Sequence, residues 1–332
     1  MRAAVLGAGA WGTALADLLA RKGVDVRLWA REPDVVQGIN REHVNGVFLP
    51  NAALAPTLTA TADPVDAVRD AEVVVSAAPS HAVRAVISAA RGGLARRALV
   101  ISVSKGLEPE KLDRMSVVLR DVLGPEARVA VMSGPSFAEE VYRRQPTLVV
   151  AAAPVEADAK AAQQAFACPH FRVYSHTDVT GVELGGALKN VIALAAGMAE
   201  GLGLGYNPRA ALITRGLAEI TRLGVALGAD PLTFAGLAGM GDLILTATGG
   251  LSRNRSLGLE LGRGRSLAEA QAGKSSVAEG VNTARTAVAL GDRHGVELPI
   301  ARQVAAILFE AKPPKQALAE LMERDLKAEQ WR

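Results

Sequence analysis

The sequence has one cysteine, few aromatic residues and little excess charge of either sign. Because Cys168 is alone, no intramolecular disulfide can form, which fits a reducing compartment. Aromatic residues make up 4% of the 332 residues and are scattered, so no platform for stacking nucleic-acid bases is visible. The 37 Lys and Arg exceed the 34 Asp and Glu by only 3. We therefore expect neither a basic nucleic-acid-binding surface nor a nucleic-acid partner.

Long apolar runs and spaced metal ligands are also missing. The mostly apolar segment Ala3–Ala16 is interrupted by glycines and continues without a good signal-cleavage site. No other apolar run approaches the ~18 residues that a membrane helix needs. The five histidines show no spacing typical of metal ligands. We therefore expect a cytoplasmic protein with no stable membrane insertion and no bound metal.

The first half of the chain alternates short β-rich runs with helical stretches. The runs lie at residues 3–6, 24–29, 72–78, 98–104, 128–132, 147–153 and 171–174. Strands separated by helices predict βαβ units and a largely parallel sheet. After His176 nearly every segment has helical periodicity, and Thr180–Glu183 fits a capping box at the start of a long helix. The pattern predicts an α/β domain over 1–180 and an all-α domain over 181–332.

A glycine motif follows the first predicted strand and opens the first predicted helix. Gly7, Gly9 and Gly12 give the spacing G-x-G-x-x-G. These glycines allow a tight turn, close approach of the backbone to a pyrophosphate, and close packing of helix on strand. The N-terminus of the helix adds amide donors and the positive end of its dipole. We interpret the motif as a dinucleotide-binding loop rather than an ordinary glycine-rich turn.

The end of the second predicted strand bears on the choice of cofactor. NAD-selective sites usually carry Asp or Glu there, whereas this chain has Arg31. An arginine can pair with the 2′-phosphate of NADPH. Glu32 follows and can still serve a ribose, and Arg31 has the alternative of being a solvated surface residue. The pattern favours NADPH (NADP) with tolerance of NADH (NAD).

Two polar segments follow later strands of the predicted sheet. Lys105 stands at the carboxyl end of one strand, which is the edge of a parallel sheet where ligands bind. Gly134 and Ser136 follow another strand at a predicted helix start, where free amides and a hydroxyl can meet a ligand. The ordinary alternatives are a surface lysine and a Ser-Pro helix cap.

A third polar segment lies inside the long helix of the second domain. Gly185 and Gly186 precede Lys189 and Asn190. Each mid-helix glycine costs roughly 1 kcal/mol relative to alanine, so something requires that face to be free of side chains. Close helix–helix packing explains the glycines but not the neighbouring Lys-Asn pair. We therefore regard Lys189 as a candidate catalytic residue.

Taken in order, these segments closely resemble bacterial-type glycerol-3-phosphate dehydrogenase, the NAD(P)-dependent enzyme that interconverts dihydroxyacetone phosphate and sn-glycerol 3-phosphate. The similarity continues in Gly236–Leu243, Ser252–Arg255 and residues 277–280. It implies a Rossmann domain followed by an all-helical domain of the 6-phosphogluconate-dehydrogenase-like type, with the active site in the cleft between them. It also implies a role in glycerophospholipid synthesis and a homodimer.

The resemblance implies roles for individual residues, with Lys189 as proton donor and acceptor. The substrate contacts that it implies are Lys105, Gly134, Asp242, Ser252, Arg253 and Asn254. The cofactor contacts that it implies are Ala10, Trp11, Arg31, Lys105, Ala138, Arg253, Val277 and Glu279. Relatives often carry Ser where this chain has Ala10, which has no hydroxyl to offer.

The chemistry of ketone reduction fits these residue types. The carbon receives a hydride and the oxygen receives a proton, which Lys189 can donate if its pKa falls toward neutrality. Partial burial and nearby Lys105 lower that pKa, whereas Asp242 orients Lys189 but opposes the shift. An arginine fork with neighbouring donors suits a phosphate dianion, and the segment that offers them is Ser252–Asn254.

Two other functions fit parts of the pattern. A β-hydroxyacid dehydrogenase of the 6-phosphogluconate type shares both domain folds and a lysine acid, but Ser252–Asn254 and the Lys105 segment argue against it. A non-catalytic NADPH-binding sensor leaves the lysines and Asp242 unexplained. Oxidation of NADPH with and without dihydroxyacetone phosphate distinguishes these functions.

Overall fold

A computed structural model of the chain describes residues 1–272, 278–326 and 328–329. Within these residues the β-rich runs of the first half form one eight-stranded sheet. Its strands, in sheet order, are β10 (Phe171–His176), β9 (Thr147–Ala152), β8 (Arg128–Ser133), β7 (Leu99–Ser102), β6 (Val73–Ser76), β1 (Arg2–Leu6), β2 (Asp25–Trp29) and β5 (Thr59–Thr61). Every run expected from the sequence is a strand, with ends that agree within two residues.

The sheet is largely parallel, as expected. Neighbouring strands from β5 to β8 run parallel, β8 and β9 pair antiparallel, and β9 and β10 are parallel to each other. From β5 to β8 the order is that of the doubly wound dinucleotide-binding fold. The predicted class, a Rossmann domain followed by an all-α domain, is confirmed.

The short hairpin of β3 (Val44–Asn45) and β4 (Leu49–Ala53) and the edge strand β5 were not predicted from the sequence. Pro50 and Asn51 interrupt the β pattern of this segment, and Asn51 has a φ of 65°. Strands this short are stabilised by what they pair with and pack against, so their local pattern is weak.

Helices cover both faces of the sheet because successive residues of a strand point to opposite sides. Ala3 and Val5 of β1 pack with the first helix and the last helix of the domain, whereas Ala4 and Leu6 pack with the helices of the other face. The helical elements of this domain are α1 (Ala10–Arg21), α2 (Pro33–Gln37), η1 (Gly38–Glu42), α3 (Pro64–Val68), η2 (Ser80–Ala82), α4 (Val83–Ala90), η3 (Arg91–Gly93), α5 (Met115–Leu123), α6 (Ala138–Tyr142) and α7 (Glu156–Phe166).

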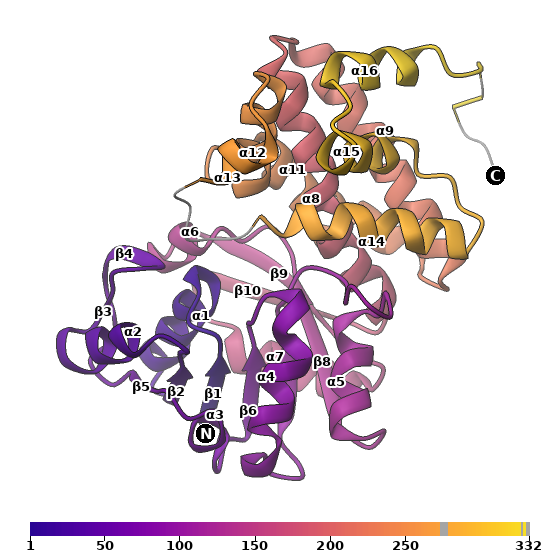
Figure 1. Ribbon diagram of the computed structural model, residues 1–332. Helices are drawn as coiled ribbons and strands as arrows, with labels where there is room; N and C mark the ends of the chain where they lie inside the picture. Colours follow the sequence, from indigo (N-terminus) through magenta and orange to yellow (C-terminus); the bar gives the residue numbers. More distant parts are fainter. Residues whose placement is uncertain (273–277, 327, 330–332) are drawn as a thin grey trace.

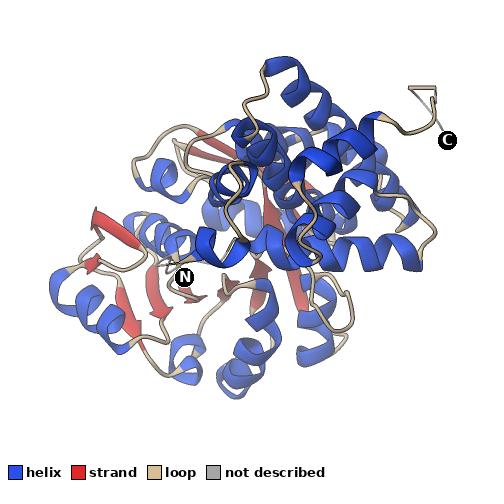
Figure 2. Cartoon of the chain, turned by 45° about the horizontal axis from the view of Figure 1, so that its top comes forward, coloured by secondary structure: helices blue, strands red, loops and turns tan. Residues whose placement is uncertain are grey.

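In the second half of the chain the described residues form helices joined by loops, with no strand after β10, as Figure 2 shows. It lies above the carboxyl edge of the sheet in Figure 1, with α8 running through its centre. Its elements are α8 (Val179–Gly201), α9 (Tyr206–Ala226), α10 (Pro231–Ala235), η4 (Leu237–Gly241), α11 (Asp242–Thr248), α12 (Arg253–Gly262), α13 (Leu267–Gln271), α14 (Glu279–Arg293), α15 (Pro299–Phe309) and α16 (Pro314–Met322).

Helix α8 is long and apolar enough to cross a membrane, yet 83% of its most apolar window is buried inside the protein. Helices α9, α11, α12 and α14 pack around it. The contact with α12 is close because glycines face each other, and a Cβ on Gly197 would stand 2.0 Å from the Arg255 carbonyl oxygen. We therefore regard α8 as the core helix of the second domain.

The start of α8 differs from the expected capping box at Thr180–Glu183. Asp178 is the N-cap, and its side chain accepts a hydrogen bond from the Gly181 amide at 2.8 Å. Glu183 instead accepts hydrogen bonds from Arg114 at 2.7 Å and from the Ser116 hydroxyl at 2.6 Å. The capping-box prediction was wrong because the carboxylate of Glu183 joins the helix to the α/β domain.

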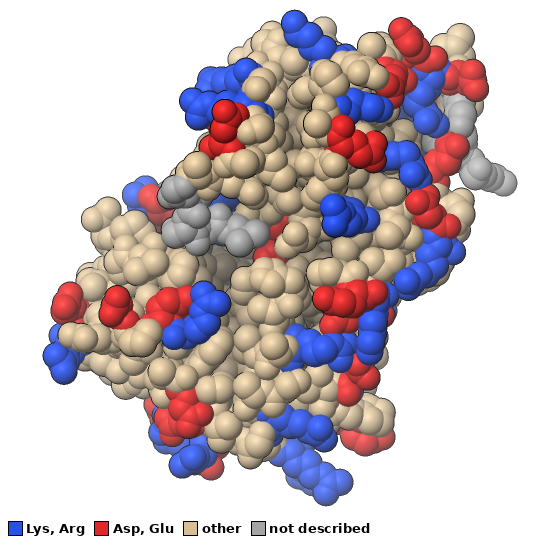
Figure 3. Space-filling model, viewed as in Figure 1, with Lys and Arg blue, Asp and Glu red and all other residues tan. Residues whose placement is uncertain are grey.

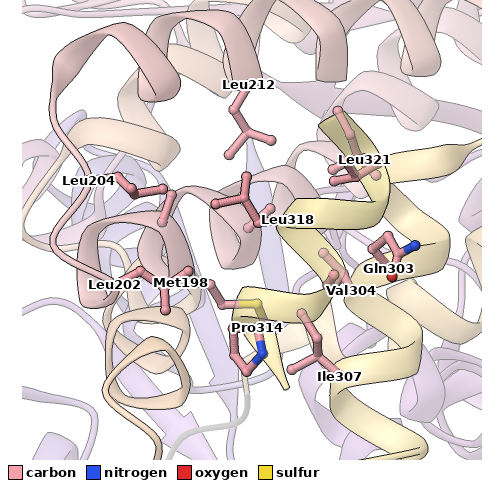
Figure 4. Close-up of a pocket in the computed structure, with 14 residues that line it drawn as sticks. Met198, Leu202, Leu204, Leu212, Gln303, Val304, Ile307, Pro314, Leu318 and Leu321 are labelled. Atoms are coloured by element: carbon pink, nitrogen blue, oxygen red, sulfur yellow. The ribbon is translucent and has the colours of Figure 1, made fainter. Parts of the chain in front are cut away.

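An apolar pocket of about 60 Å³ lies where α8, α9, α15 and α16 meet (Figure 4). Met198 of α8 and Leu202, just after that helix, line it on one side, and Leu318 and Leu321 line it from α16. Gln303 reaches its rim, where its amide donates to Glu320 at 2.8 Å. The pocket follows the C-terminal half of α8 and contains none of the candidate site residues.

Charged side chains of both signs are interspersed over the face of the molecule in Figure 3. Several pair with a residue three or four positions along the chain, such as Arg143 with Glu139 and Lys160 with Glu156. Exposed pairs of this kind contribute about 0–1 kcal/mol each. The fold therefore depends on the apolar clusters on both faces of the sheet and in the helical domain rather than on surface charge.

Candidate active site

The glycine motif forms the turn between β1 and α1. Gly7 has a φ of 122°, and a Cβ on Gly12 would stand 1.9 Å from the Gly7 carbonyl oxygen. Gly9 is the N-cap of α1, and the place of its Cβ is open space. Two glycines are thus required by packing, and the third leaves room in front of the first amides of the helix. This loop fits the pyrophosphate of a dinucleotide.

A buried asparagine fixes the shape of this turn. Asn45, in β3, donates from Nδ2 to the Ala8 carbonyl and to the Thr13 hydroxyl, both at 2.8 Å. Its Oδ1 accepts from the Phe48 amide at 3.1 Å. The side chain is fully buried and uses all its polar groups within the protein. The hairpin that the sequence did not reveal therefore holds the dinucleotide loop in place.

The candidate cofactor contacts near this loop lie on adjoining helices. Ala10 and Trp11 open α1, and Ala138 opens α6, which packs against α1. All three contact the same apolar cluster. The Nε1 of Trp11 is buried with no hydrogen-bond partner among the described residues.

Arg31 follows β2 and is 83% exposed. Its Nε and a terminal nitrogen both donate to one oxygen of Glu32, at 3.1 and 2.8 Å. The two side chains whose chemistry could choose between cofactors are therefore paired with each other. Because this pair is exposed, it holds Arg31 only weakly and a phosphate can replace the carboxylate.

One carboxylate joins two lysines from the two domains. Lys189 of α8 donates from Nζ to Oδ1 of Asp242, the first residue of α11, and to the Thr246 hydroxyl at 2.7 Å. Lys105, which follows β7, donates from Nζ to Oδ2 of the same Asp242 at 2.8 Å. Lys189 and Asp242 are both buried. Three residues that lie far apart in the sequence thus form one cluster.

The cluster changes the protonation of Lys189. Burial, which disfavours the charged form, is the largest cause that lowers the pKa of Lys189 to about 7. The Asp242 carboxylate raises this pKa, and the Lys105 ammonium lowers it. A lysine with a pKa near 7 can both donate and accept a proton at neutral pH.

The segment after β8 also reaches the cluster. The Gly134 carbonyl accepts from Lys105 Nζ at 3.0 Å and from the Ser136 hydroxyl at 2.8 Å. Gly134 has a φ of 142°, and a Cβ there would stand 2.9 Å from the Val149 Cα. The helix expected to start at Gly134 and Ser136 begins at Ala138 instead, because this backbone turns toward Lys105 first.

A chain of hydrogen bonds runs from Lys105 to the start of α14. The Asn190 side chain donates to the Lys105 carbonyl at 3.4 Å and accepts from Asn254 Nδ2 at 3.0 Å. Asn254 Oδ1 accepts from the Gly280 amide at 2.9 Å. Ser252 is the N-cap of α12, and its hydroxyl accepts from the Arg255 amide at 3.2 Å. The side chains of both Asn254 and Ser252 therefore support the backbone of the site.

Arg253 is accessible to solvent, and its charge is close enough to Glu279 for the two to interact. Crowding by the surrounding protein lowers the pKa of the Arg253 guanidinium, and the Glu279 carboxylate raises it. Glu279 opens α14. Val277, the remaining candidate cofactor contact, lies outside the described residues.

The mid-helix glycines of α8 have two explanations. A Cβ on Gly186 would stand 2.4 Å from the Ser133 hydroxyl at the end of β8 and 3.7 Å from Lys105 Cγ. The absence of a side chain at Gly186 therefore lets α8 pack closely against the α/β domain. A Cβ on Gly185 would stand 2.5 Å from the Ala238 carbonyl oxygen of η4. Close packing within the helical domain therefore explains Gly185, as it does Gly197.

Two residues of the site were missed by sequence reasoning. Thr246 lies one helical turn after Asp242, and this i, i+4 spacing is a signal that could have found it. Ser80 follows β6, and its hydroxyl donates to Glu279 at 2.7 Å. Among the described residues, no group of three or more His, Cys, Asp or Glu side chains is placed to hold a metal ion.

Comparison with protein families finds two matching models. Residues 2–159 match the model of the NAD-dependent glycerol-3-phosphate dehydrogenase N-terminus, and residues 178–319 match that of the C-terminus. A glycerol-3-phosphate dehydrogenase [NAD(P)+] from Geobacter sulfurreducens is 53% identical over 332 residues, covering 99% of each chain. One of the same description from Myxococcus xanthus is 51% identical over 331 residues, covering 99% of each chain.

Solved structures give the same picture. The crystal structure of glycerol-3-phosphate dehydrogenase from Coxiella burnetii superposes with a TM-score of 0.94 and 41% identity, covering 97% of this chain and 99% of that one. A ketopantoate reductase from Ralstonia eutropha has a TM-score of 0.63 at 21% identity, covering 96% of this chain and 100% of that one. The second similarity concerns the fold alone.

Proposed function

This chain belongs to the NAD-dependent glycerol-3-phosphate dehydrogenase family, and we propose that Lys189 transfers the proton in the reaction. The family activity, NAD(P)-dependent interconversion of glycerol 3-phosphate and its ketone, is the activity of this chain. The 6-phosphogluconate-type dehydrogenase and the non-catalytic sensor are therefore set aside.

The observation that carries the proposal is the position of Lys189 at the junction of the two domains. The lysine is buried, it is held by Asp242 and Thr246, and its pKa is about 7. In ketone reduction its ammonium donates a proton to the carbonyl oxygen as that oxygen becomes a hydroxyl. In the reverse direction the neutral amine accepts the hydroxyl proton.

The other residues of the cluster bind and orient. Asp242 holds both lysines through its two oxygens, and Lys105 places a second positive charge beside the developing alkoxide. Gly134 and Ser136 border the substrate on the side of β8. Bound NADPH supplies the hydride. Gly7, Gly9 and Gly12 admit its pyrophosphate in front of α1.

We assign the substrate phosphate to the start of α12. Arg253 offers a planar fork of donors that suits a phosphate dianion. Ser252 and Asn254 flank it, and both are buried. The Glu279 carboxylate raises the pKa of the Arg253 guanidinium, so we place Arg253 where the substrate and cofactor sites adjoin.

The proposal also covers the cofactor contacts, the preference between NADPH and NADH, and the place of the enzyme in the cell. Ala10, Trp11, Ala138 and Glu279 line the cofactor, and Arg31 favours NADPH over NADH by pairing with the 2′-phosphate. By family resemblance, the enzyme acts as a homodimer in the cytoplasm and supplies glycerol 3-phosphate for glycerophospholipid synthesis. Residues 1–180 form the cofactor unit and residues 181–332 the substrate unit.

The substitution Lys189→Ala tests the role of the lysine. A positioned general acid contributes roughly 10²–10⁴-fold, so kcat for dihydroxyacetone phosphate reduction should fall by at least that factor. Binding of NADPH, followed by fluorescence titration, should persist because the glycine loop is untouched. The exposed Lys160 is the matched control, and Lys160→Ala should behave like the parent chain. Turnover near the parent rate would remove Lys189 from the mechanism and make Lys105 the leading candidate.

A further inference from the structure

A hydrogen bond between Ser80 and Glu279 connects the two domains beside the site. Ser80 opens η2 after β6 in the α/β domain and is only 3% exposed. Glu279 opens α14 in the helical domain. The Ser80 hydroxyl donates to Oε2 of Glu279 at 2.7 Å. None of the site assignments above gives Ser80 a role.

The turn that carries Lys105 is shaped around this hydrogen bond. Gly106 follows Lys105, and a Cβ on Gly106 would stand 2.4 Å from the Ser80 hydroxyl and 3.2 Å from Oε2 of Glu279. Any larger residue would push against both partners. The Ser80–Glu279 pair therefore adjoins the turn that carries Lys105, whose Nζ donates a hydrogen bond to Asp242.

The backbone of Glu279 is held from the other side. The Gly280 amide donates to Asn254 Oδ1 at 2.9 Å, and Asn254 Nδ2 donates to Asn190 at 3.0 Å. The helical domain thus fixes where α14 begins. The direction of the Glu279 carboxylate is fixed separately, by the hydroxyl of Ser80 in the α/β domain.

Arg253 is the competing partner for this carboxylate. Arg253 precedes Asn254, whose Oδ1 accepts from the Gly280 amide at 2.9 Å, so the starts of α12 and α14 that carry Arg253 and Glu279 adjoin. The Glu279 carboxylate also raises the pKa of the Arg253 guanidinium. A bond between two ionised groups is stronger than one to a neutral hydroxyl. Without the Ser80 hydroxyl, Glu279 can turn toward Arg253, and both side chains are then lost to their ligands.

We propose that Ser80 is a positioning residue for the cofactor and substrate sites. By holding Oε2 of Glu279, it leaves the other oxygen to accept from a hydroxyl or amide donor on the reacting half of the cofactor. It also keeps the Arg253 guanidinium available to a phosphate. This inference rests on the proposed function to the extent that Glu279 contacts the cofactor.

The test is the binding of NADPH to the full chain carrying Ser80→Ala, measured by fluorescence titration without substrate. Loss of an orienting hydrogen bond to a charged group should raise the Kd by roughly five- to twentyfold. In steady-state assays the KM for NADPH and for dihydroxyacetone phosphate should both rise, while kcat changes little. A residue that only supports the fold would lower Tm without this split between KM and kcat.

Ser76→Ala is the matched control. Ser76 is the last residue of β6, the strand that precedes Ser80, and its hydroxyl is buried with no hydrogen-bond partner among the described residues. Its removal takes away a buried hydroxyl but no bond, so the Kd for NADPH should not change. If Ser80→Ala does not fold, Gly106→Ala separates the same pair by crowding and should raise the Kd in the same way.

A double substitution shows whether Ser80 acts through Glu279. Ser80→Ala combined with Glu279→Ala, which removes the accepting oxygen, should bind NADPH no more weakly than Glu279→Ala alone. Additive losses, or a Kd for Ser80→Ala equal to or tighter than that of the parent, would overturn the proposal. A parent chain that binds NADPH but does not reduce dihydroxyacetone phosphate would instead overturn the proposed function. The Kd values for NADPH of the parent and Ser80→Ala would still test the role of Ser80.

Discussion

The dinucleotide loop and the lysine cluster are built in opposite ways. The loop is a continuous segment whose ligand groups are backbone amides, and its shape depends on glycines at Gly7 and Gly12. The cluster is assembled from side chains of Lys105, Lys189 and Asp242, which come from three elements of two domains. Substitutions should therefore damage the two sites differently. Changes in the lysine cluster should affect turnover and its pH dependence, whereas changes in residues that contact the cofactor should affect the affinity for the cofactor.

The largest effect beyond that of Lys189 itself is expected from Asp242→Asn. The variant loses the charge that orients both lysines, and kcat for reduction should fall by roughly 10²-fold. Reduction needs the protonated amine, so the parent chain should lose rate as pH rises through about 7. Because the carboxylate raises the pKa of Lys189, its removal should move this loss to lower pH. The pH profiles of kcat for the two chains provide the measurement.

Asp292→Asn is the control for this variant, because Asp292 pairs with Arg302 at the surface. Its pH profile should match that of the parent. A pH midpoint that stays the same in Asp242→Asn would show that the carboxylate does not govern the protonation of Lys189.

A smaller effect, confined to phosphorylated substrate, is expected from Arg253→Ala. One charge-assisted contact is worth about 1.5–3 kcal/mol, which is roughly ten- to 150-fold in kcat/KM. Activity on dihydroxyacetone phosphate should fall by this factor, while the weak activity on unphosphorylated dihydroxyacetone should change little. Equal fractional losses on both substrates would assign Arg253 to the cofactor or to the fold.

On the cofactor side, Arg31→Asp should shift the choice of nucleotide rather than the chemistry. Loss of an arginine–phosphate contact at an exposed position should lower kcat/KM for NADPH roughly tenfold and spare or improve that for NADH. The ratio of kcat/KM for the two cofactors is the quantity to compare. Arg41→Asp, at an exposed position of the same domain, serves as the control. An unchanged ratio would mean that Arg31 does not reach the 2′-phosphate.

The smallest effect concerns stability in the helical domain, away from both sites. Glu219 is buried and accepts from the Ile300 amide at 2.7 Å at the start of α15. Burial raises its pKa to about 7, from an unfolded value near 4.5. The folded state therefore holds the proton more tightly, and this contribution to stability, complete below pH 4.5, is lost as pH rises through about 7.

In Glu219→Gln this loss should disappear, so Tm should fall less between pH 5 and pH 8 than in the parent, by a few degrees for each ~1 kcal/mol. The exposed Glu110 gives the control variant Glu110→Gln, which should keep the parent's pH dependence. The same slope in Glu219→Gln and the parent would contradict the shifted pKa.

Much of the fold could be read from local pattern. Apolar runs such as Val73–Ser76 and Leu99–Ser102 are buried on both faces, and this burial gives parallel strands their continuous apolar sequence. The hairpin of β3 and β4 could not be read in this way. Its Asn45 is held by hydrogen bonds to Ala8 and Thr13, which are distant in the sequence.

The candidate site also has parts that the sequence predicted and parts that it did not. The order of motifs along the chain predicted the family, and the comparisons confirm that prediction. The roles of individual residues remain predictions. Thr246 was missed although its spacing from Asp242 is a usable signal, whereas Ser80 was missed because its partner Glu279 lies far away in the sequence.

The sequence by itself determined the α/β order of the first half, the helical second half, the dinucleotide loop and the family. Each of these depends on periodicity or on contiguous residues, which are properties of the chain before it folds. Only the tertiary structure decided that Asp242 bridges Lys105 and Lys189, that Glu183 joins the domains instead of capping α8, and that Ser80 holds Glu279. These contacts join residues far apart in the sequence, so burial and distance, which set their chemistry, exist only in the folded protein.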